Sequence, residues 1–368
     1  MYKGVVLLLL CIPQTLFSSN YLYNDFTDTS YTYKVETTLD VKSDNLPLDF
    51  FDTDWKDYNK RRKNNYAFGL VNFEAMRKYN DFVIGVFLQK NADAYMNDIL
   101  IETLYESDKN FFAILSNKNL YKNLDAGPIL GRVNSFESSG LFFQKQFLLK
   151  DNHHFLLKLK LHLAKELDDV SVKGTSTEDS FKGKLDYYYS NSNKISNAKN
   201  LSDTPQGYGY SLDMAYIYKK DKIYAYFGVY NILSYIFWKN ISYMHYDFDS
   251  QTIYVGEDGY NHYKPFGVGY YKYNLNYTQQ IPTYAKGSLN YEFMNNLAFG
   301  DTVSIYEGMH YNEVYTTLKL LSVRYRLTYI PENYNLVFGV YHKHFLFEIS
   351  RGFEKSNRML QFRCAFTY

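Results

Sequence analysis

The fold is decided by Leu360-Gln361-Phe362-Arg363-Cys364-Ala365-Phe366-Thr367-Tyr368, the last nine residues of the sequence. Apolar side chains occupy every second position, and polar or small side chains fill the positions between them. Successive side chains of a strand point to opposite faces, so a period of two predicts a β-strand with one apolar and one polar face. This strand is expected to run to the final aromatic residue, where soluble domains usually have a frayed tail.

A strand that ends on an aromatic residue resembles the closing strand of bacterial outer-membrane β-barrel proteins, a porin-like class. The resemblance implies an all-β fold: a single closed antiparallel transmembrane β-barrel. It also implies the bacterial outer membrane as the location, membrane lipid as a partner, and delivery by the barrel assembly machinery through the C-terminal strand. Leu360, Phe362, Phe366 and Tyr368 are then expected to face lipid, and Arg363 the interior.

The same alternation recurs along the chain, with clear runs over residues 31–41, 155–163, 208–218 and 323–329. A tilted strand needs about 9 to 11 residues to cross a bilayer. Short polar turns separate several runs, whereas residues 43–65 and 190–206 are long polar loops. Short turns on one side and long loops on the other are typical of membrane barrels. We expect one domain over residues 20–368 with roughly 14 to 18 strands. The run at 31–41 is expected to pair with the closing strand.

The N-terminal segment predicts a cleaved secretory signal peptide over residues 1–19. Lys3 precedes an apolar run over residues 4–12, and the small residues Ser18 and Ser19 follow. That order is typical of a signal peptide, and the run is far shorter than the roughly 20 residues of a spanning helix. Two alternatives are an uncleaved core segment and a lipoprotein signal. A lipoprotein signal requires a small residue directly before its cysteine, whereas here Leu10 precedes Cys11.

Composition narrows the class of protein. The chain has 41 Tyr, 28 Phe and only 7 Pro, and its mean hydropathy is −0.40 although 46% of its residues are hydrophobic. Aromatic residues favour strands and form the girdles of membrane barrels, and a polar lumen explains the negative hydropathy. A soluble β-sandwich remains the alternative fold. A net charge of +1 gives no basic footprint for nucleic acid, and two cysteines form no metal or redox motif.

The charged residues on the polar faces of the runs are the candidate functional residues. Rings of charge set the selectivity of pores, and basic pairs at one height would favour anions. The alternative is that these charges solvate the lumen or pair with carboxylates to brace the wall. The candidate lumen-facing residues are Lys34, Glu36, Lys158, Lys160, Asp213, Arg324, Arg326 and Arg363.

Enzymatic and cofactor-dependent functions have little support in the sequence. No His-x-Ser pair of an outer-membrane phospholipase occurs. His245 and Asp247 alternate as in an omptin-type protease, but no second carboxylate pair accompanies them. His342 and His344 could face one side of a strand, yet two histidines make a weak metal site. We therefore expect no enzyme, no cofactor and no metal.

One segment is similar to barrels of the long-chain fatty-acid transporter group. Residues 226–233, followed by Trp238, resemble the Gly-x-x-Asn-Leu strand of that group. This resemblance implies import of hydrophobic substrates. Three hypotheses follow: a pore for small polar solutes; a non-transporting barrel that acts as a surface anchor, binding or secretion-accessory protein; and an importer of hydrophobic molecules.

Overall fold

The structure is a computed structural model that describes residues 32–43, 65–101, 126–177, 180–191, 201–307, 309–342, 344–352 and 359–368. The expected signal peptide at 1–19 lies outside these residues, as do most of the loop at 43–65 and residues 192–200 of the loop at 190–206. Among the described residues, no helix is both long and apolar enough to cross a membrane.

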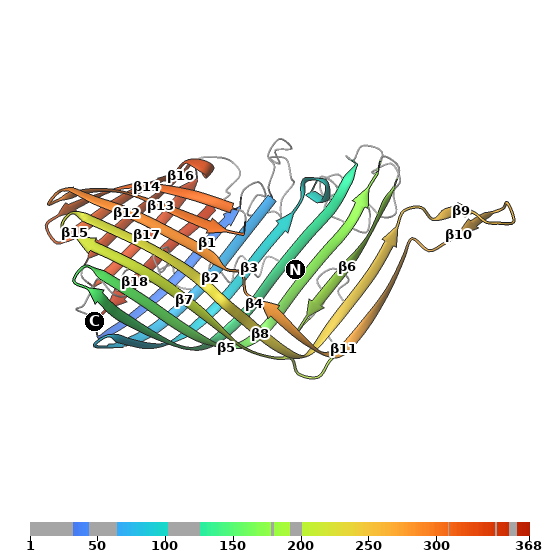
Figure 1. Ribbon diagram of the computed structural model, residues 1–368, viewed down its shortest axis with the longest axis horizontal. Coiled ribbons are helices and arrows are strands. Elements are labelled where there is room, and N and C mark those ends of the chain that lie inside the picture. The colour runs from blue at the N-terminus through green and yellow to red at the C-terminus, as the bar shows by residue number, and fades with distance from the viewer. Residues whose placement is uncertain are drawn as a thin grey trace.

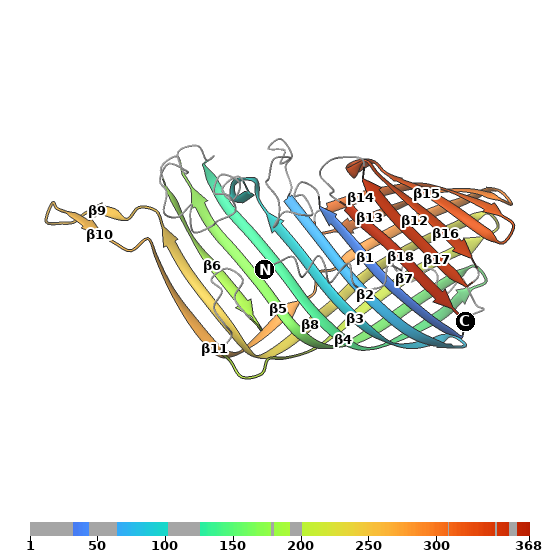
Figure 2. The ribbon, with the colours of Figure 1, turned by 180° about the vertical axis from the view of Figure 1, so that it is seen from behind.

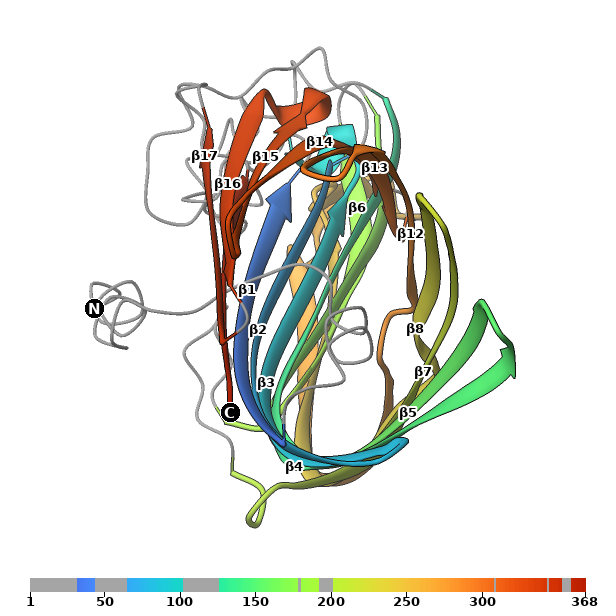
Figure 3. The same ribbon diagram turned by 90° about the vertical axis from the view of Figure 1, so that its left-hand side faces the viewer.

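Fourteen strands form a closed antiparallel barrel, which appears as a ring when it is viewed from its left-hand side (Figure 3). The ring follows the chain because each strand pairs with the next, apart from the insertions described below. Its members are β1 (Tyr33–Ser43), β2 (Asn65–Tyr79), β3 (Phe82–Met96), β4 (Gly127–Lys150), β5 (His153–Ser176), β7 (Gln206–Lys220), β8 (Ile223–Asp249), β12 (Tyr284–Met294), β13 (Leu297–Tyr306), β14 (Met309–Leu320), β15 (Val323–Ile330), β16 (Asn335–His342), β17 (Phe345–Gly352) and β18 (Met359–Thr367).

The barrel closes between its first and last strands. β1 pairs antiparallel with β18 over nine residue pairs from Lys34↔Thr367 to Lys42↔Met359, which confirms the expected seam. Alternation places Arg363 on the same face as Glu36, and Arg363 Nε donates to Glu36 Oε1 at 2.8 Å. Gln361 Nε2 likewise donates to Asp40 Oδ1 at 3.2 Å. The polar faces of the two strands therefore meet inside the barrel, as their sequences predict.

An extension of the wall continues beyond one end of the ring (Figures 1 and 2). It is built from the ends of β4, β5 and β8, which are 24, 24 and 27 residues long, together with β6 (Phe181–Tyr189) and β11 (Gly267–Gln280). β6 pairs with the same two strands as β7, namely β5 and β8, and so continues the line of β7. β11 and β12 in the same way both pair with β8. A small hairpin of β9 (Ile253–Val255) and β10 (Asn261–Tyr263) projects from the tip (Figure 1).

The outer surface of the ring carries a band of exposed apolar side chains, here called the apolar belt. On β5 the outward Leu159, Leu161 and Leu163 are exposed, while Lys158, Lys160 and His162, which alternate with them, are buried. On β5 and β8 the exposed apolar side chains end at Leu163 and Phe237, so these strands continue past the belt into the extension, where β11 exposes Val268 and several tyrosines. On the closing strand Leu360, Phe366 and Tyr368 are exposed, and Phe362 is half-buried. Further members are Val35, Val86, Leu88, Leu141, Phe143, Phe227, Leu289, Phe299, Ile305, Val314, Leu327, Phe338 and Ile349.

The seam register can be tested with the one cysteine of the described residues. Cys364 lies directly opposite Thr37. In a Cys11→Ser background, Thr37→Cys is expected to form a disulfide with Cys364 on mild oxidation, because directly opposed residues bring their Cβ atoms within the reach of an S–S bond. Non-reducing gel mobility of the boiled protein detects the cross-link. Thr38→Cys, opposite Arg363, is the matched control, and cross-linking of that control rather than Thr37→Cys would show a different register.

Candidate functional site

A layer of paired charges fills the middle of the barrel. Lys158 Nζ lies 2.7 Å from Glu74 Oε2, and Lys160 Nζ lies 3.7 Å from Asp213 Oδ2. Around the seam, Glu36 binds both Lys34 and Arg363. We call the following set the charge layer: Lys34, Glu36, Asp40, Lys42, Glu74, Lys158, Lys160, Asp213, Lys286, Glu313, Glu348 and Arg363.

The charge layer is electrically balanced and almost completely buried. It contains six cationic and six anionic side chains, and each of them is at most 6% exposed. Burial of an unpaired charge costs several kcal/mol, whereas a paired and hydrogen-bonded charge can be tolerated. The ion pairs therefore allow twelve charged side chains to occupy the interior.

An aromatic neck lies next to the charge layer on the side of the extension. The ring of Tyr284 stacks on Tyr230, with centroids 4.4 Å apart, and on Tyr306, with centroids 5.1 Å apart. Phe68 of β2 reaches across to Tyr306 at 4.5 Å. This stack stands where the chain passes from β11 to β12. The amide Nδ2 of Asn231 donates to the carbonyl oxygen of Pro282 at 3.0 Å and holds that junction against β8.

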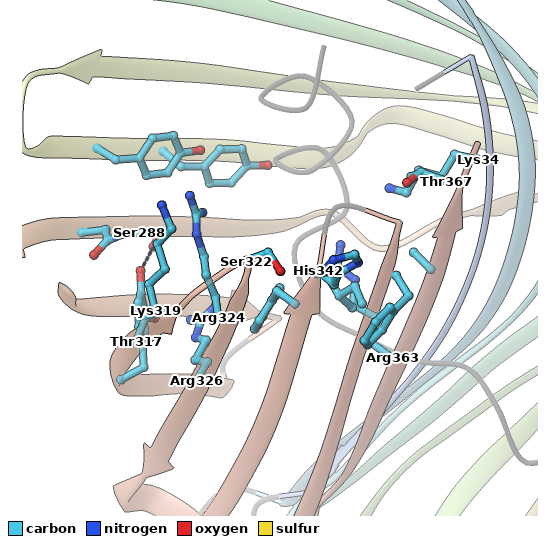
Figure 4. Close-up of a pocket in the computed structure, with 18 of the residues that line it drawn as sticks. Lys34, Ser288, Thr317, Lys319, Ser322, Arg324, Arg326, His342, Arg363 and Thr367 are labelled. Carbon is cyan, nitrogen blue, oxygen red and sulfur yellow. Dashed lines mark hydrogen bonds between the residues drawn. The ribbon is translucent and has the colours of Figure 1, made fainter. Parts of the chain in front are cut away.

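A vestibule of about 590 Å³ opens on the other side of the charge layer, at the end of the barrel with the short turns (Figure 4). Its position follows from alternation along β12, where Tyr284 belongs to the neck, Lys286 to the charge layer, and Ser288 and Asn290 to the vestibule. Basic, phenolic and hydroxyl side chains line it, including Lys219, Tyr224, Tyr226, Ser288, Asn290, Tyr315, Thr317, Lys319, Ser322, Arg324, Arg326, Tyr341, His342 and Thr367, and Lys34 and Arg363 of the charge layer reach its floor.

The structure separates the eight candidate residues from the sequence into two groups. Six of them belong to the charge layer: Lys34, Glu36, Lys158, Lys160, Asp213 and Arg363. Arg324 and Arg326 instead line the vestibule. Sequence reasoning placed Asp40 on the inner face beside Arg363, but it missed the charge partners Glu74, Lys42, Lys286, Glu313 and Glu348. Each of these occupies a polar position of an alternating run, which is the signal that could have found it.

The inner face of the extension carries a separate polar cluster around His245. His245 Nδ1 lies 2.7 Å from Asp186 Oδ1, and His245 Nε2 lies 2.9 Å from Asp247 Oδ2. The Tyr243 hydroxyl also donates to Asp186, at 2.5 Å. His245 and Asp247, which alternate in the sequence, are therefore hydrogen-bonded to each other along β8. The hydrogen bond between His245 and Asp186 joins β8 to β6. Among the described residues, no group of three or more His, Cys, Asp or Glu side chains is placed to hold a metal ion.

This cluster predicts a defined pH dependence for the extension. Burial opposes the charged form of His245, but hydrogen bonds to Asp186 and Asp247 outweigh it and raise the pKa of the imidazole above 6.5. Burial would raise the pKa of Asp186, yet hydrogen bonds from Tyr243 and His245 lower it below 3.8. The histidine's contribution to stability is thus complete below 6.5 and is lost as the pH rises through its raised pKa. The aspartate's contribution is complete above 3.8 and is lost as the pH falls through its lowered pKa.

NMR titration of the His245 imidazole tests this assignment. The midpoint is expected above 6.5 in the wild type and lower in Asp186→Asn, since that substitution removes the charged acceptor. An unchanged midpoint in Asp186→Asn would contradict the pairing.

Comparison with known proteins gives structural similarity alone. No protein-family model matches the sequence, and no curated protein matches it. Among solved structures, the deltaS2S3 mutant of the monoaromatic hydrocarbon channel TodX is 8% identical, with a TM-score of 0.43, and 92% of this chain and 89% of that chain are covered. The toluene transporter TodX of P. putida is 10% identical, with a TM-score of 0.36 and the same coverage of each chain. A closed 14-stranded antiparallel barrel with an external apolar belt is the architecture of an outer-membrane β-barrel.

Proposed function

We propose that this protein is a channel of the bacterial outer membrane for small polar solutes. The observation that carries the proposal is the vestibule, a cavity lined by basic, hydroxyl and aromatic side chains inside a closed wall whose outside is apolar. Selection in such a channel needs no chemistry, because the width and charge of the interior filter the solutes. Lipid around the apolar belt, and the barrel assembly machinery acting on the C-terminal strand, are the partners that this location would require.

The charge layer acts as the gate of the proposed channel. It lies between the vestibule and the neck, and in this proposal solutes pass when some of its ion pairs separate. Lys160 on β5 has its Nζ 3.9 Å from Glu74 and 3.7 Å from Asp213. Lys158, by contrast, binds both carboxylate oxygens of Glu74 at 2.7 and 2.9 Å. Truncation of Lys160 therefore removes a long side chain from the gate and leaves the closest ion pair on this strand in place.

Planar-bilayer recording tests the channel and its gate together. The wild type is expected to give discrete conductance steps, and Lys160→Ala larger steps with a weaker preference for anions, because one cation leaves the path. Lys165→Ala, an exposed position on the same strand, is the matched control and should behave as the wild type. Silent bilayers from protein that still shows heat-modifiable gel mobility would refute the channel and favour the non-transporting barrel.

One observation favours import of hydrophobic molecules as a second candidate function. β11 pairs with β8 along one edge and with no described strand along the other, although Gln279 and Gln280 at its end hydrogen-bond to Asn134 and Ser135 of β4. Apolar side chains gather inside the barrel at this place: Phe136, Leu167, Trp238, Ile241 and Ile281 are all buried there. A hydrophobic molecule entering through this edge would meet an apolar surface.

Binding of a hydrophobic fluorescent probe discriminates this candidate from the polar channel. Under the second candidate, Ile281→Asp weakens binding of the probe about tenfold or more, since a charge then occupies the apolar cluster. Leu289→Asn, an exposed position on β12, serves as the control. If Ile281→Asp and Leu289→Asn bind the probe equally well, the probe binds to the outer apolar belt, and import through the edge of β11 loses its support.

A further inference from the structure

Four basic side chains of the vestibule form no ion pair with a carboxylate of the described residues, although Arg326 interacts at longer range with Glu313 and Glu348. Of its basic side chains, Lys34 and Arg363 are paired with carboxylates of the charge layer. Lys219, Lys319, Arg324 and Arg326 also line the cavity, and no carboxylate of the described residues lies within ion-pair distance of them. The lining contains no Asp or Glu. The balanced charge layer therefore borders a cavity in which every charged lining residue is basic.

Two of these cations face each other across neighbouring strands. Lys319 of β14 is directly opposite Arg324 of β15, and Thr317 is opposite Arg326 one step further in. Like charges in directly opposed positions destabilise a sheet, because their Cβ atoms are only about 5 Å apart. Figure 4 shows Lys319, Arg324 and Arg326 together on one side of the pocket, with Ser288 and Thr317 beside them. An anion between these side chains would remove the repulsion.

Arg326 gives an independent indication that a ligand is expected here. Its guanidinium carbon lies 3.5 Å from the centre of the Tyr315 ring, which fixes the orientation of the group by a cation–π contact. Its Nε is buried and has no hydrogen-bond acceptor in the described structure. Arginine donates in a rigid fork that matches a carboxylate or phosphate, so a buried unused donor is a costly arrangement unless an acceptor arrives.

We propose that the vestibule is a binding site for a small molecule that carries a phosphate or carboxylate group. Lys319, Arg324 and Arg326 supply the positive charge, Ser288 and Thr317 supply hydroxyl donors, and the Tyr315 ring holds Arg326 in place. The volume of about 590 Å³ lies in the range of small-molecule sites, so the anionic group can belong to a larger organic solute. This inference rests on the proposed channel, because it names the class of solute that the channel would select.

Isothermal titration of the folded full-length protein in detergent tests the site directly. Inorganic pyrophosphate and citrate are the probes, and sucrose is the neutral control, all at pH 8 and low salt. The wild type is expected to bind at least one of the two anions saturably and to ignore sucrose. Lys319→Gln with Arg324→Gln, and separately Arg326→Gln, should weaken binding at least about tenfold, as expected for loss of a hydrogen bond to a charged group.

A matched control excludes nonspecific attraction. Lys220 and Lys222 flank the same mouth in exposed positions but do not line the cavity. Lys220→Gln with Lys222→Gln removes the same formal charge and should leave the affinity unchanged. Heat-modifiable mobility establishes that each variant is folded. The site is refuted if the wild type binds neither anion, or if the control loses as much affinity as the vestibule variants.

The failure of this site and the failure of the channel are distinguishable. Saturable anion binding by a protein that gives no conductance steps would retain the site and refute the channel. Conductance without anion binding would retain the channel and refute the site.

Discussion

The need to pair every backbone group of a sheet in lipid is the constraint on which the rest of this structure depends. An open edge cannot be tolerated in hydrocarbon, so the wall must close, and here it closes between β1 and β18. Closure turns one face of every strand toward a common interior. That interior then collects the polar positions of all fourteen strands, and the charges of the charge layer are paired with one another. The ion pair between Glu36 and Arg363 is the first consequence, since it joins residues from the two ends of the sequence.

Alternation along single strands sorts the interior into three zones. Along β14, Tyr311 packs with the neck residues, Glu313 belongs to the charge layer, and Tyr315, Thr317 and Lys319 line the vestibule. The charge layer is balanced, whereas the vestibule has only cations. In the proposed channel the two zones have separate tasks: the first acts as the gate and the second binds anions. The inner face of the extension beyond the neck carries both acidic and basic side chains. There, His245 is hydrogen-bonded to Asp186 and to Asp247.

The sequence predicts the wall better than the contents of the barrel. Period two gives the strands, their inward faces and the seam, and from the seam it gives the proximity of Arg363 to Glu36 and of Gln361 to Asp40. It does not give the contact of Lys158 with Glu74, because these residues are separated by three strand crossings and meet only across the lumen. Which residues share a height around a barrel depends on the cumulative register of all ladders. A single irregularity, such as the shift between Glu137 and Ser138, changes that register.

The extension was likewise beyond the reach of periodicity. β6 and β7 read as two separate strands in sequence, yet they occupy one line between β5 and β8, and β11 and β12 occupy another. Strand length alone could have indicated it, since β8 continues for 27 residues where about 10 suffice to cross a bilayer. Only part of the vestibule lining can be identified from the sequence. The alternating Arg324 and Arg326 are visible in the sequence, but their meeting with Lys319 and Tyr315 is a property of the hairpin register and rotamers.

A double-mutant cycle on Glu36 and Arg363 tests most directly the claim that paired charges across the seam close the barrel. Glu36→Gln, Arg363→Met and the double variant are compared with the wild type by reversible urea unfolding in lipid vesicles. Each single change is expected to cost about 3 to 5 kcal/mol, because it breaks a buried ion pair and leaves the remaining charges unbalanced. The double variant should then lose less than the sum of the two single losses, with a coupling free energy of at least about 1 kcal/mol. Additive losses with no coupling would contradict the account.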